Sequence, residues 1–261
     1  MLMKLLKYEC KASMRIFGVV YLAILGLCVG SGILNRITEY EKLSYFNEPI
    51  SQVGVVVYII TFLFLLAAVV ITTVINLRRF YQGVFRDEGY LMHTLPVQPW
   101  EILTSKLLAA VLWTIATGLV MLVGVGIAVT IGYIDSIVDF IQGVAEFFTD
   151  LFSDPMYLLL ALVELVCTIL RVYAAIALGQ IFSRRVMAAV LAWFGLNTIQ
   201  TWAGMLLGAN VFETLVDSMF IFFEPDTSLS AYALLIGVTL FWSAAYWVVT
   251  QWVMTKKLNL E

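Results

Sequence analysis

Six long stretches of apolar residues alternate with shorter polar segments, at about Ile16–Leu34, Val53–Leu77, Thr104–Ile134, Tyr157–Phe182, Val186–Leu207 and Leu229–Met254. Each is long enough for an α-helix that crosses the hydrocarbon core of a bilayer, which takes about 20 residues. The third stretch is too long for one upright crossing, so we expect it to tilt or to project from the membrane. The five prolines fall between these stretches or at their edges, where they can end helices or, like Pro99, begin them. The pattern predicts an all-α membrane protein with six transmembrane helices in a single domain, residues 1–261.

Lysine and arginine residues are concentrated in alternate connecting segments. If the N-terminus is cytosolic, the inner segments hold twelve of these residues and the outer segments hold two. Cytosolic segments carry such an excess of positive charge, so we expect both the N-terminus and the C-terminus in the cytosol. The same topology makes residues 78–105 a cytosolic loop, and residues 135–155 and 209–228 extracytoplasmic loops.

The first 15 residues form a basic segment ahead of the first apolar stretch. Lys4, Lys7, Lys11 and Arg15 recur at helical spacing on one stripe, and leucines favour the other side. Such a pattern is typical of an amphipathic helix that lies along a membrane surface. We therefore expect an interfacial helix over residues 1–15; the alternative is an ordinary basic flank that happens to be helical.

The cytosolic loop 78–105 combines an apolar helical face with charge. Phe80, Val84 and Phe85 share one helical face, and Asp87 and Glu88 follow directly. The adjacent charges prevent this segment from crossing the bilayer. Exposed apolar residues beside charges predict a docking surface for a cytosolic partner. The alternative is an amphipathic loop that rests on the lipid headgroups.

The fourth and fifth apolar stretches carry polar residues. Glu164 and Arg171 lie seven residues apart, and hence on one face of the fourth helix. Asn197 and Thr201 lie along one side of the fifth. A charge at the centre of a bilayer costs about 2.5–3.5 kcal/mol on the insertion scale, so these side chains should face away from lipid. They are candidates for a translocation pathway, and the alternative is a fixed intramembrane ion pair.

Two GxxxG motifs occur within the apolar stretches. Gly26 and Gly30 lie in the first stretch, and Gly204 and Gly208 lie at the end of the fifth. This spacing lets two helix backbones approach closely, so the four glycines are candidates for helix packing or a dimer contact.

Composition narrows the classes of function. Hydrophobic residues make up 62% of the chain, and the net charge of −3 leaves no basic stripe for nucleic acid. There is no phosphate-binding loop, and His93 is the single histidine, so no catalytic constellation is recognisable. Cys10, Cys28 and Cys167 are scattered, which favours buried thiols over a metal site. We expect a chain that is not an enzyme and that itself binds no metal or cofactor.

Two segments carry a resemblance to a known family. The stretch FRDEGYLMHTLPVQPWEILTSKLLAA, from Phe85 to Ala110, resembles the loop between the second and third helices of ABC-2-type transporter permease subunits. The ending TKKLNLE, from Thr255, is similar to their usual C-terminus, and six spans with a basic N-terminal helix match their topology.

The resemblance implies a multi-subunit exporter in the plasma membrane of a bacterium. Two permease chains, identical or homologous, would assemble with two ATPase subunits that bind ATP and magnesium. The loop would be a coupling helix whose ATPase-contacting residues are Phe80, Val84, Phe85, Asp87, Glu88 and Leu91. The first and fifth helices would meet across the dimer, which gives the four GxxxG glycines a purpose. The exported substrate would be a peptide, a lipid or a hydrophobic drug.

Other functions fit the same topology. An ion channel or secondary transporter would need no ATPase, although inverted repeats and broken helices are not evident in the sequence. A non-transporting scaffold or an immunity protein could keep six helices without any pathway. A membrane enzyme is disfavoured by the missing catalytic groups.

Overall fold

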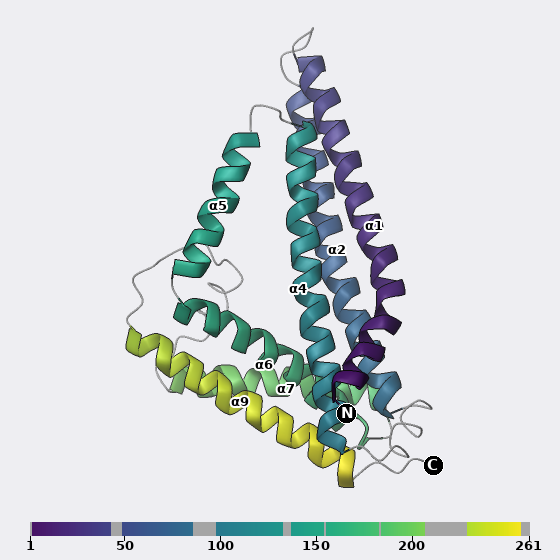
Figure 1. Cartoon of the computed structure of the whole chain (residues 1–261), viewed down its shortest axis with the longest axis vertical. Helices are drawn as coiled ribbons and strands as arrows, with labels where there is room; N and C mark the ends of the chain where they lie inside the picture. Colours follow the sequence, from purple (N-terminus) through teal and green to yellow (C-terminus); the bar gives the residue numbers. More distant parts are fainter. Residues whose placement is uncertain are drawn as a thin grey trace. The chain divides into compact units, whose positions relative to one another are not determined.

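The computed structural model describes residues 2–42, 49–85, 98–132, 137–153, 155–182, 184–206 and 229–256 (Figure 1). Within these ranges all regular secondary structure is helical. The helices are α1 (Leu2–Lys42), α2 (Pro49–Phe85), α4 (Pro99–Gly132), α5 (Ile137–Ser153), α6 (Pro155–Gly179), α7 (Arg185–Leu206) and α9 (Leu229–Lys256). All except α5 are long and apolar enough to cross a membrane, which confirms the six predicted spans as candidates by length and composition.

Prolines begin three of the helices. Pro49, Pro99 and Pro155 are the first residues of α2, α4 and α6, as predicted for Pro99. Proline is well suited to this position because its fixed φ matches the helix and its missing N–H has no intrahelical acceptor there.

The first two helices extend well beyond the predicted spans. Helix α1 has 41 residues, or about 60 Å at 1.5 Å per residue, so residues 2–15 of the basic segment continue without a break into the first span. Its position along the membrane surface stays a prediction, as does the cytosolic location of the termini. Helix α2 continues through Arg78 and Arg79 to Phe85, so the first part of the predicted loop 78–105 is helical.

The chain forms two compact units, and the first comprises Leu6–Asn76 and Leu112–Asp150. Here α1 packs against α4 through aromatic rings: Phe17 stacks on Trp113 with ring centroids 4.5 Å apart. The Tyr21 hydroxyl lies 3.1 Å from the Thr117 hydroxyl, which is also 3.2 Å from that of Thr72 in α2. These hydroxyl contacts join α1, α2 and α4 between their apolar faces.

Glycines allow α1 and α4 to approach closely farther along. A Cβ atom on Gly32 would lie 2.9 Å from the carbonyl oxygen of Ala128, and one on Gly132 would lie 3.1 Å from Cβ of Asn35. Both separations are shorter than ordinary van der Waals contact. A Cβ on Gly124 would lie 2.9 Å from the Cys28 sulfur. On α4, Gly124, Ala128 and Gly132 therefore form a stripe of small residues at four-residue spacing that faces α1.

We expect Gly32→Val to destabilise this unit by about 2 kcal/mol, because the added side chain meets a backbone carbonyl that cannot rotate away. The measurement is the free energy of unfolding in detergent micelles, titrated with sodium dodecyl sulfate and followed by circular dichroism. Gly18→Val in the same helix is the control, since a Cβ there meets nothing within 4 Å. Equal destabilisation by both substitutions would contradict the close approach.

The second compact unit comprises Met1–Leu5, Leu77–Val111 and Leu151–Glu261. Helix α6 packs against α7 and α9. The end of α2 also lies in this core, where the Phe80 ring stacks on Tyr173 of α6 with ring planes 5° apart. Leu103 and Leu107 of α4 and Val253 of α9 complete the same apolar cluster. The unit therefore surrounds α6 with side chains from four other helices.

Candidate intramembrane polar site

The polar residues of the second unit gather around Arg171, near the middle of α6. Its side chain is only 5% exposed, between the buried apolar residues Leu170 and Ala174. One guanidinium nitrogen, Nη1, donates to Asn197 Oδ1 at 2.8 Å and to Gln200 Oε1 at 3.3 Å. Both amides lie on α7, three residues apart, and so share one helical face. The arginine therefore joins α6 to α7 through two charge-assisted hydrogen bonds.

The network extends to α9. The hydroxyl of Tyr246 donates to the same Gln200 Oε1 at 2.8 Å, so this oxygen accepts from both α6 and α9. Gln200 and Tyr246 are 6% and 2% exposed. Interhelical hydrogen bonds help van der Waals packing to hold membrane helices together. Gln200 supplies such bonds to both α6 and α9, and it thereby connects three candidate spans.

The arginine is not fully satisfied by these contacts. Nη2 lies 3.4 Å from the hydroxyl of Thr168, and the buried Nε has no hydrogen-bond partner among the described residues. The Glu164 carboxylate lies beside the hydroxyl of Thr239 in α9. Its interaction with Arg171 is electrostatic at a distance, since no ion pair joins these two side chains in the described part of the chain. The guanidinium is thus held by neutral oxygens and keeps a free donor.

The structure brings together some of the sequence-predicted pathway residues. Arg171 and Asn197 are directly hydrogen-bonded, whereas the Thr201 hydroxyl donates to the carbonyl of Asn197 within α7. Gln200 and Tyr246 are additional members. Gln200 could have been found from its place three residues after Asn197 in an apolar helix. Tyr246 has no comparable signal, because a tyrosine in an apolar helix is common.

The predicted exposure of the docking face is wrong for three residues. Phe80, Val84 and Phe85 are at most 8% exposed and belong to the chain's own apolar cluster with Leu103 and Tyr173. The periodic pattern identified the apolar face correctly, but this face packs against α4 and α6 of the same chain and is not exposed to a partner protein. The other three proposed ATPase-contacting residues, Asp87, Glu88 and Leu91, lie outside the described residues.

The structure describes three of the four GxxxG glycines. A Cβ on Gly26 or Gly30 would meet nothing within 4 Å, so neither packs against another of the helices that the structure describes. Gly204 lies in α7, and Gly208 lies outside the described residues. Their role in a dimer stays a prediction.

The geometry limits what the site can do chemically. Among the described residues, no group of three or more histidine, cysteine, aspartate or glutamate side chains could hold a metal ion. A buried guanidinium with a free Nε–H is instead suited to hold helices together or to bind an anionic group. Comparisons with protein-family models, with curated proteins and with solved structures each found no match, so the interpretation of this site rests on its residues alone.

Proposed function

We propose that this chain is the membrane-spanning permease subunit of an ATP-driven exporter, coupled to a separate ATPase. The observation that carries the transport role is the buried Arg171 network within a set of candidate membrane spans. A cation is expensive at membrane depth, and intramembrane ionisable groups commonly mark substrate or ion pathways. The ATPase partnership rests on the resemblance of residues 85–110 to the loop of ABC-2-type permeases.

The proposed assembly contains two permease chains and two ATPase subunits in a bacterial plasma membrane. The ATPases bind ATP and magnesium, and the permease moves a peptide, a lipid or a hydrophobic drug out of the cell or out of the bilayer. In this assembly the segment that contains Asp87, Glu88 and Leu91 contacts the ATPase. Because Phe80, Val84 and Phe85 are buried beside α6, movement of this segment is transmitted directly to the core around the polar site.

Affinity purification of the tagged chain from its native membrane tests the proposal. We expect an ATPase with a phosphate-binding loop to co-purify at equal stoichiometry in mild detergent, identified by mass spectrometry and by ATP hydrolysis. A chain that purifies without an ATPase in several detergents would contradict the proposal and favour an ATPase-independent channel, a secondary transporter or a scaffold.

We expect the double charge reversal Asp87→Lys/Glu88→Lys to reduce the co-purified ATPase by about tenfold or more, since like charges placed against a partner surface oppose association. The readout is the ratio of ATPase to permease after purification. Asp139→Lys/Glu146→Lys, in the predicted extracytoplasmic loop, is the matched control and should leave this ratio unchanged. An unchanged ratio in the first variant, with normal membrane insertion, would remove the coupling role.

A further inference from the structure

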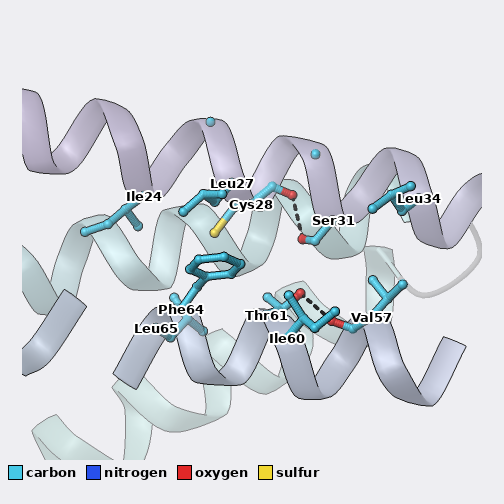
Figure 2. Close-up of a pocket in the computed structure, with 12 residues that line it drawn as sticks. Ile24, Leu27, Cys28, Ser31, Leu34, Val57, Ile60, Thr61, Phe64 and Leu65 are labelled. Atoms are coloured by element: carbon cyan, nitrogen blue, oxygen red, sulfur yellow. Dashed lines mark hydrogen bonds between the residues drawn. The ribbon is translucent and has the colours of Figure 1, made fainter. Parts of the chain in front are cut away.

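An apolar groove runs between α1 and α2 within the first compact unit (Figure 2). Its buried lining includes Ile24, Cys28 and Val57, and exposed side chains line it as well, among them Leu27 and Phe64. Figure 2 shows these side chains directed into the space between the two helices. The groove has a volume of about 200 Å³ and is open on the side of the exposed residues.

The lining offers no unused hydroxyl. The Ser31 hydroxyl donates to the carbonyl of Cys28 at 2.9 Å, and the Thr61 hydroxyl donates to the carbonyl of Val57 at 2.8 Å, so both are used within their own helices (Figure 2). A bound water needs two to four polar partners, and an apolar cavity without them stays dry. Water is therefore a poor occupant, and hydrocarbon is a favourable one.

Gly26 and Gly30 keep the groove open. Both line it, and a Cβ atom on either would meet nothing within 4 Å. The lining residues of α1 extend from Ile24 to Leu34, or about 15 Å along the helix axis. A second helix with its side chains is about 10–12 Å wide, which is much wider than an extended alkyl chain. A single extended alkyl chain fits this shape better.

We propose that this groove binds one acyl chain of a bilayer phospholipid. The lining of α1 lies inside the candidate membrane span Met3–Ile37, so acyl chains are the molecules that surround it. An empty groove would leave the side chains on both helices without van der Waals partners, and an ordered chain restores those contacts. This site is independent of the proposed transport function, because it requires neither an ATPase nor the Arg171 network.

The experiment uses the full chain in nanodiscs of phosphatidylcholine that contain a fraction of phosphatidylcholine with a photoreactive diazirine on one acyl chain. After illumination, peptide mass spectrometry measures the crosslinks to residues 24–34 and 57–65. We expect these peptides to be labelled above the exposed face of α7 around Leu191 and Phe194, which serves as the reference for ordinary surrounding lipid.

Gly26→Leu/Gly30→Leu adds two large side chains to the lining of the groove and should reduce this labelling about tenfold, since many small contacts with the acyl chain are lost together. Gly18→Leu, at another open glycine of α1 outside the groove, should leave it unchanged. If the double variant does not fold, by gel filtration and circular dichroism, Gly30→Leu alone is used with the same expectation.

Two results would overturn the proposal. One is labelling of the groove that equals the α7 reference and does not respond to the leucine substitutions. The other is a disulfide-linked dimer of a Gly30→Cys chain without labelling of the groove, which would assign this face to a second copy of the chain.

Discussion

Replacing Asn197 and Gln200 together by leucine is expected to lower the free energy of unfolding by about 3–5 kcal/mol. The substitutions remove both amide acceptors of the Arg171 guanidinium and leave only the 3.4 Å contact with Thr168. They also remove the acceptor of the buried Tyr246 hydroxyl. A buried charge and a buried donor would thus lose their partners at the same time.

The measurement is a titration with sodium dodecyl sulfate in mixed micelles, followed by tryptophan fluorescence and circular dichroism. Thr198→Leu is the control on the same helix, because this threonine is exposed and its hydroxyl donates to the carbonyl of Phe194 within α7. We expect its effect to stay within about 0.5 kcal/mol. A double variant whose free energy of unfolding is unchanged would show that the guanidinium finds other partners and that the network does not fix α6 against α7.

Adding Arg171→Met to the double variant should restore most of the lost stability. Removing the charge together with its partners leaves an apolar contact of similar size, which is often neutral or stabilising. The triple variant also separates structure from function. If it folds but lacks the proposed export activity, the network serves that activity; if it folds and keeps the proposed activity, the network only holds helices together.

Gly179→Val is expected to cost about 3 kcal/mol, the second large effect. A Cβ at this position would lie 2.7 Å from Cβ of Ala189 and 2.8 Å from both the amide nitrogen of Ala189 and the carbonyl oxygen of Arg185. Two of these three atoms belong to the backbone of α7, so no side-chain rotation relieves the overlap. The connection between α6 and α7 would have to open.

The turn after Gly179 explains why this approach is so close. The amide of Gln180 donates to the carbonyls of Ile176 and Ala177, and the amide of Ile181 donates to that of Leu178, which tightens the end of α6. Helix α7 then begins at Arg185. Gly195→Val is the control, because a Cβ there meets nothing within 4 Å and the change should have little effect. Similar unfolding curves for both variants would contradict the tight connection.

Much of the fold follows from the sequence because membrane helices are set by local properties. The length of each apolar stretch predicted six candidate spans, and the position of Pro99 predicted where α4 begins. The cost of a charge in hydrocarbon likewise identified Arg171 as a residue that must turn away from lipid, and it is buried. None of these conclusions requires knowledge of which helices are neighbours.

The tertiary structure alone decided what those residues contact. The sequence showed that the face around Phe80 is apolar, but Tyr173, on which Phe80 stacks, lies far along the chain. The sequence therefore predicted an exposed face where the structure has a buried one. The glycines that bring α1 and α4 together are Gly32, Gly124 and Gly132, whereas the GxxxG motif in α1 faces an open groove. A periodic pattern specifies which side of a helix is apolar or small, whereas the pairing of helices depends on side-chain shapes that meet only after folding.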